Sequence, residues 1–149
     1  MKKTLIQILW HFLTLACMVV IFLLSSQDGQ SSSQLSQGFI RYMEELLVID
    51  ISSMPNIQQI IRKGAHMFIY FVLGLVTMGT MYTYKIRLKP KILITLSVVF
   101  IYAITDEIHQ IYVPGRSGSF VDVMIDTVGG FIGMMLMIGI MSRKRKNKI

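Results

Sequence analysis

Residues 104–126 concentrate side chains that could carry out chemistry within an otherwise apolar chain. They hold four carboxylates, which are half of the eight Asp and Glu residues in the sequence, together with a histidine and an arginine. A histidine beside a carboxylate can act as a general acid or base, and a cluster of both can hold a divalent metal ion. Arginine is suited to bidentate contact with phosphate or carboxylate groups. The side chains concerned are Asp106, Glu107, His109, Arg116, Asp122 and Asp126.

The elements that must position these side chains are membrane helices. Of the 149 residues, 53% are hydrophobic and only 15% are charged. Apolar runs of about 20 residues indicate membrane spans, so we expect an all-α polytopic membrane protein with a single domain over residues 1–149. The only cysteine, Cys17, lies in the first run, which excludes a disulfide framework or a thiol metal site. The four expected spans are about residues 5–24, 65–84, 92–112 and 120–141.

The third span has to continue past its uncharged part. Residues 92–104 give roughly 20 Å of helix, whereas the hydrocarbon core of a bilayer needs roughly 30 Å. The helix is therefore expected to continue through "TDEIHQIY", residues 105–112, which draws Asp106, Glu107 and His109 into the membrane boundary. The Pro-Gly pair at residues 114–115 then ends it.

The distribution of Lys and Arg predicts the orientation of the spans. Most of the basic residues lie near the N-terminus, in the segment 85–91 and in the C-terminal tail 143–148. Basic loops stay in the cytoplasm, so both termini are expected there, with the segment 25–63 and the turn 114–119 on the extracytoplasmic side. The basic residues fall between apolar runs rather than along one binding face, which argues against a nucleic-acid partner.

The first extracytoplasmic segment contains a polar part and an amphipathic part. The stretch "SSQDGQSSSQ", residues 25–34, predicts a loop. The following "LSQGFIRYMEELLVI", residues 35–49, predicts an amphipathic helix that lies on the membrane or on the bundle. The favoured interpretation of this helix is a packing lid without chemistry of its own. Its apolar residues at helical spacing are Leu35, Phe39, Ile40, Met43, Leu46 and Leu47.

The last three spans each carry polar side chains at the extracytoplasmic end. In the second span Arg62, His66 and Tyr70 are four apart and share one helix face, with Lys63 beside them, and Asp122 and Asp126 share a face in the fourth. Ionisable groups within spans are costly and normally face the bundle interior, a partner or a water-filled cavity. We therefore expect them to meet at one depth and to form a ligand site. They are Arg62, Lys63, His66 and Tyr70 of the second span, Asp106, Glu107, His109 and Gln110 of the third, Arg116 of the turn, and Asp122 and Asp126 of the fourth.

Each of these residues also has a structural explanation. Ser119 and Asp122 have the spacing of a capping box at the start of the fourth span. Arg116 could pair with Asp106 or Asp122 to hold the turn, and the two histidines could be hydrogen-bonded residues of the membrane boundary. As a group, the residues favour a functional site, because one helix cap does not require so many ionisable side chains at one depth.

Three stretches of the chain resemble the VanZ family of small bacterial membrane proteins: "SSQ" (25–27), "RKGAHMFIYFVLG" (62–74) and "DEIHQIYVPGRSGSFVDVMIDTVGGFIG" (106–133). The resemblance implies a multi-pass protein of the bacterial plasma membrane, of the type found in glycopeptide-resistance clusters, where a member reduces susceptibility to teicoplanin. It implies no established reaction. Asp126 stands where the family pattern often has Asn. The residues that fall on the pattern are Arg62, Lys63, His66, Tyr70, Asp106, Glu107, His109, Gln110, Pro114, Gly115, Arg116, Asp122 and Gly129 or Gly130.

The first functional hypothesis is a ligand-binding protein of the cell envelope. Arg62, Lys63 and Arg116 would contact the phosphate or carboxylate of the ligand, and Asp106 and Asp122 would orient these cations. The ligand would be an anionic lipid, a lipid-linked peptidoglycan precursor, or a lipopeptide or glycopeptide antibiotic. Membrane lipids are the expected partners, and no cofactor is expected.

The alternative is an enzyme of the outer leaflet. His66 or His109 would act as general base beside Asp106 or Glu107. A divalent metal in the acidic cluster stays open, although the sequence contains no HExxH or other specific ligand spacing. A third interpretation is a structural partner protein, and a homo-oligomer through the GxxxG face at residues 129–133 is also open.

Overall fold

The computed structural model describes residues 2–47 and 50–146, and these residues form five helices and no strand. Four of the helices are long and apolar enough to cross a membrane, which confirms the all-α fold with four spans and a further helix between the first two. The helices are α1 (Lys2–Ser25), α2 (Gly29–Leu47), α3 (Ile57–Tyr82), α4 (Leu88–Ile111) and α5 (Phe120–Lys146).

The helices extend past the apolar runs that predicted them. The second span was expected from residue 65, but α3 begins at Ile57 and includes Arg62 and Lys63 in its first turns. Likewise α4 continues through Asp106 and Glu107 and ends at Ile111, as the length argument required. Polar residues extend these helices because helical backbone hydrogen bonds do not depend on whether the side chain is apolar. This extension places the polar residues on rigid helices rather than on loops.

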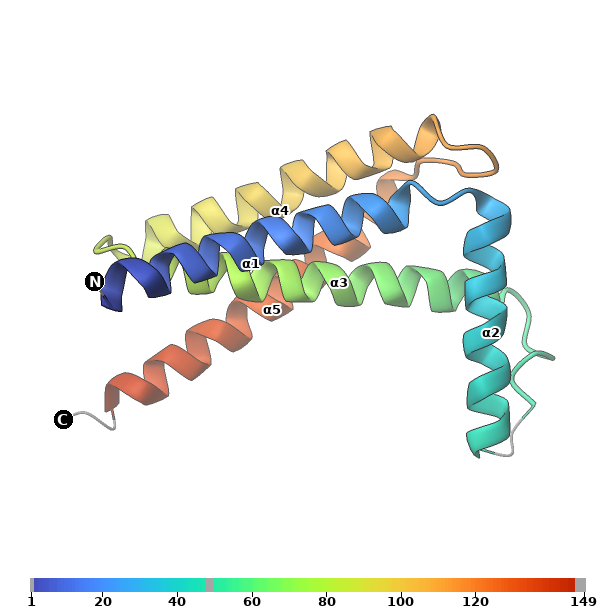
Figure 1. Ribbon diagram of the computed structural model, residues 1–149, viewed down its shortest axis with the longest axis horizontal. Coiled ribbons are helices and arrows are strands. Elements are labelled where there is room, and N and C mark those ends of the chain that lie inside the picture. The colour runs from blue at the N-terminus through green and yellow to red at the C-terminus, as the bar shows by residue number, and fades with distance from the viewer. Residues whose placement is uncertain (1, 48–49, 147–149) are drawn as a thin grey trace.

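The four spans run side by side, and α2 crosses them at one end (Figure 1). Both ends of the described chain lie at the opposite end of the bundle, because the four long helices alternate in direction. The most extensive packing joins α3 to α5, and α3 also contacts α1, α4 and α2. The core between the spans contains fully buried Tyr70, Leu73, Val99 and Ile21. Many large apolar side chains on the outer surfaces are exposed, as expected of helices that face lipid.

Glycines of α5 allow the close approach of α3. A Cβ on Gly129 would overlap the backbone carbonyl of Met67, and one on Gly133 would overlap that of Phe71. The GxxxG face of residues 129–133, which the sequence left open for a homo-oligomer, therefore packs against α3 of the same chain.

The polar stretch that follows α1 is the start of a helix, so the prediction of a loop over residues 25–34 was wrong. Only residues 26–28 separate α1 from α2. The carboxylate of Asp28 accepts a hydrogen bond of 2.6 Å from the backbone N–H of Ser31, as in a helix N-cap. The same hydrogen bond holds the pKa of Asp28 below its usual value. With this cap, the polar serines of the stretch continue as helix.

The face that α2 presents to the bundle is small and partly polar. Its buried residues are Ser32, Ser36 and Ile40, and the backbone N–H of Gly29 donates to the Pro114 carbonyl at 3.0 Å. The other apolar residues of the expected stripe are exposed or only partly buried. An amphipathic helix is therefore confirmed as far as Leu47, and residues 48–49 of the expected stretch lie outside the described residues. Two serines and Ile40 dock this helix on the bundle, while the rest of its apolar stripe is exposed or partly buried.

Candidate functional site

A polar cavity of about 280 Å³ lies where α3, α4 and α5 meet, at the end of the bundle that α2 crosses. Eight of the eleven residues expected in a ligand site line it, and their role in binding stays a prediction. The cavity also contains Gln59, Ser117, Ser119 and Ile125, which carried no charge signal in the sequence. The eight expected residues are Arg62, Lys63, His66, Glu107, Gln110, Arg116, Asp122 and Asp126.

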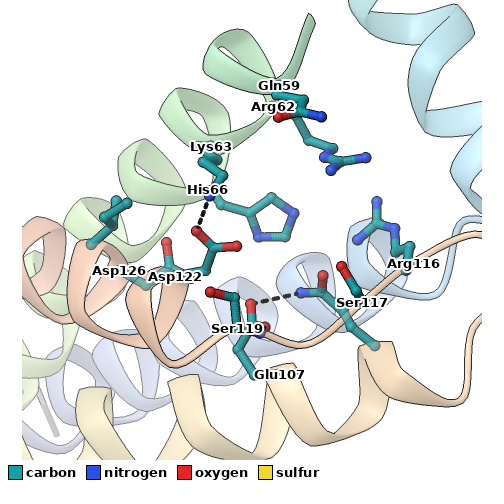
Figure 2. Close-up of a pocket in the computed structure, with 12 residues that line it drawn as sticks. Gln59, Arg62, Lys63, His66, Glu107, Arg116, Ser117, Ser119, Asp122 and Asp126 are labelled. Carbon is teal, nitrogen blue, oxygen red and sulfur yellow. Dashed lines mark hydrogen bonds and ion pairs between the residues drawn. The ribbon is translucent and has the colours of Figure 1, made fainter. Parts of the chain in front are cut away.

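Charge is arranged unevenly around this cavity. Figure 2 shows Arg62 and Arg116 on one side, the carboxylates of Glu107 and Asp122 on the other, and the His66 ring between them. Lys63 pairs with Asp122 at 2.5 Å, so its charge is compensated. Among the described residues, neither arginine forms an ion pair with a carboxylate. The arginine side is therefore the part of the cavity with uncompensated positive charge.

The Arg116 guanidinium group donates only to neutral groups, and some of its nitrogens have no partner among the described residues. Its Nη2 donates to the Leu24 carbonyl at 3.2 Å and to the Ser32 hydroxyl at 3.0 Å. Its Nε and Nη1 are buried and lack a partner among the described residues. Burial lowers the pKa of the Arg116 guanidinium from its usual value, and the nearby charge of Arg62 acts in the same direction. The carboxylates of Asp106, Glu107 and Asp28 act in the opposite direction from a distance, but none forms an ion pair with this partly buried cation.

The pairing of Arg116 with Asp106 or Asp122, considered from the sequence, is not formed. Asp106 lies outside the cavity lining and is buried between α1 and α4. Its Oδ2 accepts hydrogen bonds from the Ser25 hydroxyl at 2.8 Å and from the Gln110 amide at 3.0 Å. Asp106 therefore joins α1 to α4 through Ser25, a residue whose uncharged side chain gives no signal of this contact in the sequence.

The capping box expected at the start of α5 is replaced by contacts between helices. The backbone N–H of Ser119 donates to Glu107 Oε2 of α4 at 2.6 Å, in place of the carboxylate of Asp122. Asp122 instead pairs with Lys63 of α3. The first contact holds the start of α5 against α4, and the second holds α3 against α5.

Two further candidates lie away from the cavity. The Tyr70 side chain is fully buried in the core, where its hydroxyl has no partner among the described residues. The His109 ring contacts α1 instead: its Nε2 is 3.1 Å from the Ser26 hydroxyl and the ring packs on Phe22 with centroids 4.8 Å apart. Of the two histidines, only His66 lines the cavity.

His66 lies beside the buried acid. Its Nδ1 is 4.0 Å from Asp106 Oδ2, too far for a hydrogen bond, and this buried nitrogen has no other partner among the described residues. Within residues 2–47 and 50–146, no group of three His, Cys, Asp and Glu side chains has a geometry that could hold a metal ion. The arrangement places the His66 ring next to the wall that carries Arg62 and Arg116.

An apolar groove of about 480 Å³ adjoins the polar cavity. Side chains of α1, α2 and α3 form its walls. Arg62, His66 and Arg116 line both the groove and the cavity, so these three residues form the wall that the two hollows share.

Comparison with known proteins identifies one family. A family model described as VanZ/LLP1 matches residues 10–142, which include parts or all of each of the five helices. Neither the curated proteins nor the solved structures contain a significant match to the chain.

Proposed function

The chain belongs to the VanZ/LLP1 family of membrane proteins, and on this premise we propose that it binds the anionic group of a cell-envelope component. The ligand is an anionic envelope lipid or precursor, or a glycopeptide or lipopeptide antibiotic such as teicoplanin. Binding takes place in the polar cavity, at the extracytoplasmic face of the bacterial plasma membrane. It contributes to envelope protection or antibiotic resistance.

One observation carries this proposal: two arginines without ion pairs line the same cavity. Arg116 has two buried nitrogens without a partner among the described residues, and Arg62 has no carboxylate partner there. A guanidinium group binds phosphate or carboxylate through parallel N–H donors, and the low dielectric of a partly buried site strengthens the contact. The cavity is therefore suited to an anion of small or moderate size.

The position of the basic residues supports the proposed orientation. The α3–α4 connection, which contains Lys85 and Arg87, lies at the end of the bundle opposite α2, and so does the end of α5 that carries Arg143. Lys and Arg near span ends favour the cytoplasmic side. On this rule the termini are cytoplasmic and the cavity opens on the extracytoplasmic side. Lys148, which contributes to the basic tail, lies outside the described residues.

The test of this function is anion binding by purified protein in lipid nanodiscs. Ethyl phosphate and acetate serve as probes of phosphate and carboxylate recognition. We expect Arg116→Ala and Arg62→Ala each to weaken binding of the preferred probe by about tenfold to a hundredfold, as loss of a charge-assisted hydrogen bond should. The matched control is Arg41→Ala, because Arg41 is exposed on α2 and lines neither hollow.

Equal binding by the wild-type protein and both cavity variants would contradict the proposed function. Teicoplanin susceptibility of bacteria that express each variant provides the second readout. Protein abundance in the membrane is measured in the same cells, so that loss of protein is not read as loss of binding.

A second function is supported by the position of His66. Its Nδ1, which has no hydrogen-bond partner among residues 2–47 and 50–146, lies beside the wall formed by the two arginines and near Asp106. A general base for an anionic ester would be required at such a position. If the protein hydrolyses such an ester, His66→Ala should lower phosphate release from dodecyl phosphate by about a hundredfold or more. His109→Ala is the control, because that ring contacts α1 outside the cavity.

No phosphate release above a protein-free sample, or release that His66→Ala leaves unchanged, would remove this acid–base function. A chelator is added in a parallel sample. Release that persists with chelator excludes a removable divalent metal from the reaction.

A further inference from the structure

The groove beside α2 is lined by apolar side chains that nothing in the described chain covers. Leu35 and Phe39 come from α2, Leu24 from α1, and Ile61, Ala65 and Phe68 from α3. Leu35, Phe39 and Phe68 are 59%, 52% and 64% exposed. The groove is therefore an open, apolar surface that suits an apolar ligand.

The charged end of this groove determines what kind of occupant fits. Its lining changes from apolar side chains to Arg62, His66 and Arg116, and beyond these residues lies the polar cavity. Arg116 also binds α2 directly through the Ser32 hydroxyl, so the cationic wall and the wall of the groove are physically joined. The groove is therefore apolar along most of its lining and cationic at the wall that it shares with the polar cavity.

We infer that this groove binds the hydrocarbon chain of an anionic amphiphile whose phosphate or carboxylate headgroup lies against Arg62 and Arg116. The inference rests on the proposed function, since it assigns a ligand class to the same site. It adds that the protein itself holds the hydrocarbon chain of the ligand, with α2 as the outer wall of the groove. The ligand enters sideways from the bilayer, with its head toward the cavity.

The expected energetics follow from the membrane environment. A chain in the bilayer is already in an apolar medium, so the groove gains little from the hydrophobic effect. Binding there depends on van der Waals packing of the chain and on the charge contact of the headgroup. A larger side chain that fills the groove should therefore displace the hydrocarbon chain of the ligand, whereas the same substitution outside the groove should not.

Gly64 offers such a change. It lines the groove, and a Cβ placed on it meets no atom within 4 Å, so a larger side chain extends into open space. Gly38 on α2 meets the same criterion but does not line the groove. Gly64→Leu therefore places a side chain in the groove and Gly38→Leu does not, while both substitutions bring the same gain in helix propensity over glycine.

The experiment is photolabelling in phosphatidylcholine nanodiscs. The probe is a single-chain alkyl phosphate with a diazirine in its chain, and a probe with the same chain and a trimethylammonium head is the charge control. Mass spectrometry locates the adducts. We expect the phosphate probe to label groove residues of α2 and α3, and Gly64→Leu to reduce this label about tenfold while Gly38→Leu leaves it unchanged. The trimethylammonium probe should not be enriched in the groove.

The outcomes separate the two proposals. If Arg116→Ala weakens ethyl phosphate binding but the alkyl phosphate label falls outside the groove or ignores Gly64→Leu, the groove assignment is wrong and the anion site stands. If ethyl phosphate binding does not depend on Arg116 and both probes label the groove alike, the anion-binding function is wrong as well. Label in the groove that depends on Gly64, Arg116 and the negative head supports both.

Discussion

Gly133→Ala is expected to lower the free energy of unfolding by about 3 kcal/mol, at the upper end of the usual cost of overpacking. A Cβ at this position would overlap the Phe71 carbonyl oxygen and crowd the backbone of Leu75. Both obstacles are backbone groups of α3, so no side-chain rotation can relieve the overlap. The helices α3 and α5 would have to separate along the most extensive interface of the bundle.

The matched control for this prediction is Gly139→Ala on the same helix. A Cβ at Gly139 meets no atom within 4 Å, and the change should add up to about 1 kcal/mol of helix propensity. The measurement is helix content by circular dichroism during a titration with sodium dodecyl sulfate in mixed micelles. Two similar unfolding curves would show that α3 and α5 are not held together by this glycine contact.

Asp106→Ala is expected to cost about 3 kcal/mol of stability. Asp106 is only 4% exposed, and its Oδ2 is the acceptor for both the Ser25 hydroxyl and the Gln110 amide. The alanine variant leaves the Ser25 hydroxyl without this buried acceptor and leaves the Gln110 amide only its longer contact of 3.4 Å to Glu107, and each unsatisfied buried group costs about 1–3 kcal/mol. It also removes a contact between α1 and α4, which pack on each other less extensively than α1 packs on α3 or α4 packs on α5.

The amide variant Asp106→Asn refines this prediction. It keeps an acceptor oxygen and nearly the same volume, so we expect a smaller loss than in Asp106→Ala. Glu45→Ala, a change at an exposed acid of α2, should alter stability by less than about 0.5 kcal/mol. The same titration measures all three variants. An Asp106→Ala protein as stable as Glu45→Ala would mean that the buried network does not join α1 to α4.

These two predictions concern different parts of the same architecture. The glycine contacts set how closely α3 and α5 approach, and that approach places Lys63 of α3 within reach of Asp122 of α5. The Asp106 network holds the end of α1, whose Leu24 carbonyl accepts a hydrogen bond from Arg116. Loss of either is therefore expected to disturb the cavity as well as the fold, which is why binding tests use Arg41 and Gly38 as controls.

The sequence by itself determined the number of spans, the amphipathic helix after the first one, and the continuation of α4 to Ile111. These properties are local: they depend on the length of an apolar run and on helical periodicity, which neighbouring residues define. The convergence of Arg62, His66, Glu107 and Asp122 was also predictable. Polar residues at the same depth in adjacent spans avoid lipid by facing the bundle interior.

Tertiary structure alone decided which partners these residues have. Asp106 binds Ser25 rather than Arg116, the His109 ring contacts α1, and the GxxxG face packs on α3. Such pairings depend on how each helix is rotated about its axis, and close contacts between residues far apart in the sequence set that rotation. The start of α2 at Gly29 was not predicted, because a Ser/Gln-rich composition favours a loop. The helix forms there because Asp28 caps it and the Gly29 N–H binds the Pro114 carbonyl. The wall shared by the cavity and the groove likewise exists only in the folded chain, because its residues come from α3 and from the turn before α5, which are far apart in the sequence.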